Sequence, residues 1–121
     1  MIKFRFQDLE IWKIAIDLAD NLFDIADSLE SKHLYRFAEQ LRGASMSISN
    51  NIAEGSGSSS KKEFIQFLNI AKRSGFENAN ILILLAKRNL ITVQQLNSLL
   101  ENIDHLSRKI TNFQKSPKKQ T

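Results

Sequence analysis

The sequence predicts an all-α protein, an antiparallel up-down-up-down four-helix bundle, and three observations support this class. Apolar residues recur at three- and four-residue spacings through most of the 121 residues, as in amphipathic helices. The chain has one proline and four glycines, too few for the frequent turns of a sandwich or barrel. Four periodic segments follow one another with short connections, which makes sequential helices antiparallel neighbours in a single domain.

The first two helices are expected over about residues 8–29 and 33–53. Asp8 is a plausible N-cap of the first helix. Its core-facing residues are predicted to be Trp12, Ala15, Ala19, Leu22, Phe23 and Ala26. Those of the second helix are Leu34, Phe37, Ala38, Leu41, Ile48 and Ile52. Gly55-Ser56-Gly57 then supplies the predicted stop, with a loop over residues 55–59.

The last two helices each begin with a capping box. Ser60 with Glu63 opens a helix over about 60–88, which Asn89 ends, and Thr92 with Gln95 opens one over about 92–114. The third helix would bury Phe64, Phe67, Leu68, Ala71, Leu82 and Leu85. The fourth would bury Leu96, Leu99, Leu100, Ile103, Leu106, Ile110 and Phe113. The bundle therefore spans residues 1–114, and residues 115–121, with Pro117, form a basic C-terminal tail.

Several classes of chemistry lack the residues that they need. The chain has no cysteine, which excludes disulfides and thiolate sites and suits a reducing cytoplasm. We expect a cytoplasmic protein, because its start lacks a signal-peptide core and its apolar runs are too short for a membrane. No Glu-x-x-His pair is present, and His33 and His105 are interpreted as lone surface histidines. We therefore expect no metal, no cofactor and no enzymatic activity.

The segment from Gly55 to Lys62 superficially resembles a phosphate-binding loop before a helix N-terminus. It follows a helix, however, and lacks the Gly-Lys-Ser/Thr order of a Walker motif. A flexible interhelical turn is the main interpretation, with incidental anion binding as the alternative.

Charge is distributed unevenly along the chain. Residues 1–60 contain six Lys/Arg and nine Asp/Glu, whereas residues 61–121 contain eleven and four, so the halves carry −3 and +7. The basic half could meet an acidic partner, or the halves could be complementary faces in an assembly.

On a helical wheel, the first helix has more apolar surface than a bundle helix commonly needs. In order around the wheel, its apolar side chains run from Ile14, Leu18 and Ile25 through Leu22 and Trp12 to Ile16, and together they cover about 200° of the circumference. This favours self-association over a broad core contact. An acidic stripe, here Glu10, Asp17, Asp20, Asp24 and Asp27, lies within about 100° of the remaining circumference, with Lys13 the only basic residue among them. The residues predicted for self-association are Ile14, Asp17, Leu18, Asp20, Asp24 and Ile25.

The third helix has a basic stripe opposite its apolar face. Lys62, Arg73 and Lys87 fall within about 40° of one another on the wheel. Lys61, Lys72 and Arg88 flank the stripe, and Arg108, Lys109, Lys115, Lys118 and Lys119 follow in the chain. A solvated face, a head-to-tail contact with the acidic stripe of another copy, or a contact with a phosphate backbone would each explain this pattern.

Three segments together resemble the four-helix bundle family first associated with intervening sequences in bacterial 23S ribosomal RNA genes. They are Asp8-Leu9-Glu10-Ile11-Trp12-Lys13, the stretch from Gln40 through Arg42 to Asn51-Ile52-Ala53-Glu54-Gly55, and Glu63 to Lys72. Gly43 stands where the family usually has a second arginine, and Ser49 stands where it usually has a proline.

The resemblance implies a homopentameric ring, similar to the accessory protein of diversity-generating retroelements, which is thought to bind nucleic acid and a reverse transcriptase. It adds Arg42 to the candidate nucleic-acid contacts, although the polar residues of that segment could equally serve structure. The leading hypothesis is a non-enzymatic, self-associating bundle that binds RNA, DNA or a nucleoprotein through its basic face. The alternative is a protein-binding adaptor with no nucleic-acid role.

Overall fold

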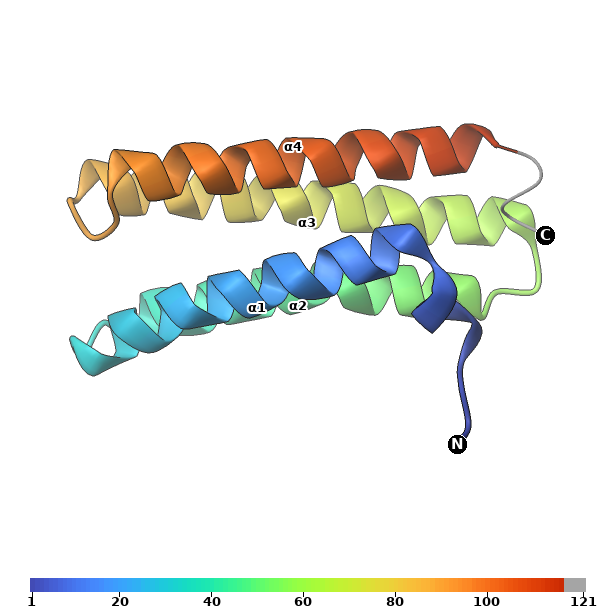
Figure 1. The fold of residues 1–121 in the computed structure, drawn as a ribbon, viewed down its shortest axis with the longest axis horizontal. Helices are drawn as coiled ribbons and strands as arrows, with labels where there is room; N and C mark the ends of the chain where they lie inside the picture. The colour runs from blue at the N-terminus through green and yellow to red at the C-terminus, as the bar shows by residue number, and fades with distance from the viewer. Residues whose placement is uncertain (117–121) are drawn as a thin grey trace.

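The computed structural model describes residues 1–116 and places four helices in one antiparallel bundle (Figure 1). The helices are α1 (Glu10–Ser31), α2 (Tyr35–Ser56), α3 (Lys61–Lys87) and α4 (Val93–Lys115), and a short 3-10 helix, η1 (Arg5–Asp8), precedes them. Each helix packs against the next, and α1 also packs against α4. Within residues 1–116, α1 and α3 therefore lie diagonally across the bundle, as do α2 and α4.

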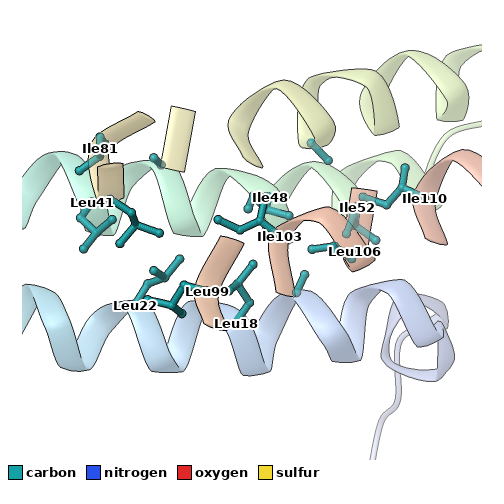
Figure 2. Packing of buried hydrophobic residues seen from close by; sticks show 14 of the residues in the cluster. Leu18, Leu22, Leu41, Ile48, Ile52, Ile81, Leu99, Ile103, Leu106 and Ile110 are labelled. Carbon is teal, nitrogen blue, oxygen red and sulfur yellow. The ribbon is translucent and has the colours of Figure 1, made fainter. Parts of the chain in front are cut away.

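A single hydrophobic core runs along the bundle axis. Figure 2 shows Leu18 and Leu22 of α1, Ile48 of α2 and Ile103 of α4 meeting between the helices. Burial of each such side chain contributes about 1.5–3 kcal/mol to folding. Most predicted core residues are buried, but Leu34 before α2 is half-buried, as are Trp12, Phe23, Phe37, Phe67, Leu96 and Leu100 within the helices. The helix wheel places the latter six beside the core face, where one flank of the side chain meets solvent.

The α1–α2 and α3–α4 connections have the same turn geometry, and in the first of them it shifts two predicted helix ends. His33 and Asn89 take left-handed backbone angles, with φ of 64° and 60°. The next amide then reaches back five residues: Leu34 N–H donates to the Leu29 carbonyl and Leu90 N–H to the Leu85 carbonyl, each at 2.9 Å. As a result α1 continues to Ser31 rather than residue 29, and α2 begins at Tyr35 rather than residue 33.

The N-caps differ from prediction at one helix and follow it at two. Asp8 is not the cap of α1, because η1 ends there and Leu9 occupies the cap position without a side-chain bond. A 2.7 Å ion pair with Lys3 holds Asp8 instead, and this hydrogen bond lowers the pKa of its carboxyl. Ser60 Oγ accepts from the Glu63 amide at 3.1 Å. Thr92 and Gln95 form the complete reciprocal box at the start of α4.

The second helix ends within the predicted Gly55-Ser56-Gly57 stop, but three residues later than residue 53. Helix α2 continues through Gly55 to Ser56, and Gly57 at its end has a φ of −87°, which does not require glycine. Gly55 is buried inside the helix, facing Phe64 and Phe67 of α3. The residue is therefore small because two helices approach each other there, not because the chain turns.

The N-terminal segment extends from the end of the bundle that holds the α2–α3 connection (Figure 1). Arg5 fixes its base: Nη1 donates to the Ser56 carbonyl at 3.0 Å, and the guanidinium lies 5.5 Å from the centre of the Phe64 ring. Phe6 packs on Trp12, with ring centres 5.1 Å apart. At the other terminus Lys115 is the last residue of α4, and residues 117–121 of the predicted tail lie outside the described residues.

Candidate nucleic-acid interface

The basic stripe of α3 faces solvent because the opposite side of the helix is committed to the core. Phe64, Leu68 and Leu82 are buried between α2 and α4. Lys62, Arg73 and Lys87 are separated by eleven and fourteen residues, about three and four helical turns, and therefore line up on the outer side. All three side chains are exposed, as are Lys61 and Arg88 at the ends of the helix.

These five cations have no carboxylate partner within residues 1–116. Every ion pair of the described chain uses other residues: Lys3 with Asp8, Arg42 with Asp27 and Glu30, Arg108 with Asp104, and Lys109 with Glu10. Unpaired surface cations keep their full positive potential for a ligand. The structure thus divides the nine predicted nucleic-acid residues into a free set, Lys61, Lys62, Arg73, Lys87 and Arg88, and an engaged set.

Arg42 is the most strongly engaged member of the second set. Its guanidinium donates to Asp27 at 2.6 Å and to Glu30 at 2.8 Å, and it lies 6.0 Å from the centre of the Phe23 ring. The hydrogen bonds to Asp27 and then Glu30 raise the pKa of Arg42 above its ordinary value. Arg42 therefore ties α2 to the end of α1 next to the first hairpin, and its charge is balanced within the chain.

The other engaged cations, Lys72, Arg108 and Lys109, all make contacts that involve α4. Arg108 pairs with Asp104 one turn earlier at 3.1 Å, and Lys109 reaches Glu10 of α1 at 3.2 Å. Lys72 Nζ donates to Thr111 Oγ1 at 3.1 Å, across the seam between α3 and α4. Lys72 and Lys109 thus link α4 to its neighbours, the Arg108 pair lies within α4, and none of the three cations is free.

Sequence reasoning missed a group of apolar side chains on the outer side of α3. Phe76 is 66% exposed and Ile83 is 49% exposed, and Ile70 and Leu84 are also exposed. Phe76 also lines a shallow groove between α3 and α4, together with Ile70, Arg73 and Thr111. The seven-residue spacing of Phe76 and Ile83, displaced from the core face, is the signal that could have identified this patch.

Most of the acidic stripe of α1 is free. Asp17, Asp20 and Asp24 are exposed and have no cationic partner in the described chain, whereas Glu10 and Asp27 are paired. Of the apolar residues predicted for self-association, Leu18 is buried in the core of its own bundle. Ile14 and Ile25 are half-buried and pack against that core, so they help to fill the bundle itself.

The polar residues between Arg42 and Gly55 mainly satisfy partners within the bundle. Asn51 Nδ2 donates to the Ser47 carbonyl at 2.7 Å. Ser47 Oγ and Ser74 Oγ are 2.8 Å apart and link α2 to α3. These contacts favour the structural interpretation of the segment over a direct contact with nucleic acid.

The Ser-Gly turn before α3 is short, and a side chain of the turn itself caps the start of α3. Gly55 and Ser56 belong to α2, and the Ser60 cap occupies the Glu63 amide that an anion at the helix start would need. Within residues 1–116, no group of three or more His, Asp or Glu side chains could hold a metal ion. No helix of the described residues is long and apolar enough to span a membrane.

Comparison with known proteins now places this bundle. The family model described as 23S rRNA-intervening sequence protein matches residues 7–112, nearly the whole bundle. The chain belongs to this family. A crystal structure of a protein of unknown function from the S23 ribosomal protein family of Bacteroides thetaiotaomicron has the same fold, with a TM-score of 0.82 at 22% identity, covering 88% of this chain and 99% of that one. No curated protein matches the chain.

The family match covers all three segments that carry the resemblance, and the structure gives their residues physical roles. Arg42, Asn51 and Gly55 respectively clamp α1, satisfy a backbone carbonyl and admit close packing of α3. Gly43, where the family usually has a second arginine, is exposed and has open space around it. The departure at Gly43 therefore leaves the packing of the bundle unchanged.

Proposed function

We propose that this family member is a non-enzymatic, self-associating helical bundle, a homopentameric ring, that binds nucleic acid or a nucleoprotein through α3. The observation that supports nucleic-acid binding is the free set on α3: five exposed cations without a carboxylate partner, while the other predicted contacts are engaged. Cations that neutralise phosphates release counterions, which is the main source of affinity for a polyanion.

Self-association would increase the affinity for nucleic acid, because each copy adds the same cations to the binding surface. A single subunit offers few free cations along about 40 Å of helix, at 1.5 Å for each residue of α3. Several copies held together present several sets of free cations to one strand, and each additional contact becomes intramolecular. We therefore expect binding to depend on the assembly as well as on the charge of α3.

The direct test measures the binding of purified protein to mixed RNA and DNA ligands over a range of salt concentrations. Affinity should fall steeply as salt rises, and Lys61→Glu with Lys62→Glu should reduce the slope of log K against log salt by about 2 for each subunit in contact. The matched control is Lys32→Glu with Arg36→Glu, which changes net charge equally at the first hairpin, the opposite end of the bundle.

Equal losses in both double variants would mean that net charge, not α3, governs binding, and no binding at low salt would exclude a nucleic-acid role. Light-scattering mass, alone and with ligand, tests the ring: a mass near that of a pentamer supports it, and a monomer excludes it. Both properties are measured on the same preparation.

A protein-binding adaptor is the second candidate, and the exposed Phe76 and Ile83 favour it. A nucleoprotein such as a reverse transcriptase complex, the partner that the family resemblance implies, would combine both kinds of contact. Self-association that persists while nucleic-acid binding is absent at low salt would favour the adaptor.

A further inference from the structure

The outer faces of α1 and α3 are chemically complementary. We define the α3 outer face as Ile70, Arg73, Phe76, Ile83, Leu84 and Lys87, and the α1 outer face as Ile16, Asp17, Asp20 and Asp24. The α3 outer face has several exposed apolar side chains among unpaired cations, and the α1 outer face has one, Ile16, among unpaired carboxylates. Each face also holds one exposed residue of the opposite sign, Glu77 on α3 and Lys13 on α1. Because α1 and α3 are diagonal in the bundle, the two faces point in opposite directions.

The composition of the α3 outer face suits a protein better than a polyanion. A phosphate backbone would use Arg73 and Lys87 but would leave Ile83 and Leu84 in water. Phe76 could stack on a base, but aliphatic side chains have no ring to stack, and each gains by burial at about 25 cal/mol for every Å² of apolar surface. Exposed apolar residues grouped in this way mark a contact surface between proteins.

The α1 outer face supplies what such a surface requires. Asp17, Asp20 and Asp24 have no cationic partner in their own described chain, and Ile16 is exposed beside them. Opposite charges steer two such faces together and fix their register, while the apolar residues supply the buried area. Two copies of α3 or two copies of α1 would instead place like charges opposite one another.

We infer that the α3 outer face of one subunit binds the α1 outer face of a second copy. This inference deepens the proposed self-association and rests on it. The contact is heterologous, because two different surfaces meet, and every subunit can use both, so that copies join head to tail and close into a ring when the rotation permits. Arg73 and Lys87 then belong to the assembly, and the rest of the free set, Lys61, Lys62 and Arg88, is left for nucleic acid.

Charge reversal followed by mixing tests this pairing by light-scattering mass. One variant carries Arg73→Glu and Lys87→Glu, and the other carries Asp20→Lys and Asp24→Lys. Each should be monomeric alone, because one of its two faces is repelled. A one-to-one mixture should assemble into a dimer or larger species, since the native α1 face of the first variant meets the native α3 face of the second and their two reversed faces are also complementary. All four changes in one chain should restore assembly.

A neutral change separates apolar burial from charge. Phe76→Ser should lower the mass of the assembly, while Val93→Ser, at an equally exposed apolar residue at the start of α4, should leave it unchanged. Circular dichroism checks that each variant retains its helices. Neither serine variant alters net charge, so a change in mass cannot come from altered repulsion between subunits.

The outcomes separate the two proposals. A wild-type monomer removes the proposed self-association and this interface together. A wild-type oligomer whose mass is unchanged in all variants overturns only the interface. A mixture that remains monomeric shows that the two faces do not meet, and loss of nucleic-acid binding by Arg73→Glu with Lys87→Glu at unchanged mass assigns the α3 outer face to nucleic acid.

Discussion

Gly55 of α2 lies so close to Phe67 of α3 that a Cβ added to the glycine would be 2.7 Å from the phenylalanine Cβ and 2.8 Å from Cδ1 of Phe64. Gly55→Ala should therefore destabilise the bundle by about 1–3 kcal/mol, because a buried helix seam must separate to admit a methyl group. The measurement is urea unfolding followed by circular dichroism.

Gly43 in the same helix is the control for this change. It is exposed and has nothing within 4 Å of an added Cβ, so Gly43→Ala should stabilise the protein by up to about 1 kcal/mol through helix propensity. Substitutions of the same kind are thus expected to have opposite signs. Stabilisation by Gly55→Ala would mean that the two helices are less closely packed than described.

Asn78 is a fully buried residue of α3, and the oxygen of its side-chain amide has no hydrogen-bond partner in the described residues. Nδ2 donates to the Ser74 carbonyl at 2.8 Å, which leaves Oδ1 as the unsatisfied atom of this amide within residues 1–116. Asn78→Leu removes that buried acceptor while keeping the same number and branching of side-chain heavy atoms, and we expect a gain of about 1 kcal/mol in the free energy of unfolding. Asn78→Asp should be strongly destabilising, because it adds a buried charge.

A loss of stability in Asn78→Leu would contradict this explanation and would indicate that the amide determines how α3 packs. Thermal unfolding distinguishes these results, provided that it is measured at the same protein concentration for all variants, since self-association shifts the midpoint.

Arg42 should contribute to the stability of the α1–α2 hairpin and not to the affinity for nucleic acid. Arg42→Gln removes both ion pairs, to Asp27 and Glu30, and we expect a small loss of stability that shrinks as salt is added. Nucleic-acid affinity should remain close to that of the wild type, because the charge is already balanced within the chain. A fall in affinity as large as that of Lys61→Glu with Lys62→Glu would place Arg42 in the interface.

Thr92 and Asp8 allow a comparison of a real cap with an apparent one. Thr92→Ala should cost about 1 kcal/mol, because the Gln95 amide loses its acceptor at the start of α4. Asp8→Ala should change the midpoint of urea unfolding less, since the exposed Asp8 pairs with Lys3 and caps no helix. Equal effects of the two substitutions would be inconsistent with Leu9 as the N-cap of α1.

Local sequence signals predicted most of the fold because they act within one helix. The periodicity of Leu22, Ile48, Leu68 and Ile110 located the core, and hydroxyl caps located the starts of α3 and α4. The predicted ends of the first hairpin were less accurate, because its left-handed residue is His33 and not glycine, the residue that most readily takes such angles. The role of Gly55 was misassigned because its neighbours in space, Phe64 and Phe67, follow it in the chain by several residues.

The sequence by itself determined the helical class, the family and the segregation of charge, since periodicity, motif order and composition are properties of the chain alone. Only the tertiary structure decided which cations remain free. Arg42, Lys72 and Lys109 meet partners on other helices, whereas Lys62, Arg73 and Lys87 meet none among the described residues. The physical reason is that pairing depends on distances between helices, which packing of the core sets and no spacing along one helix encodes.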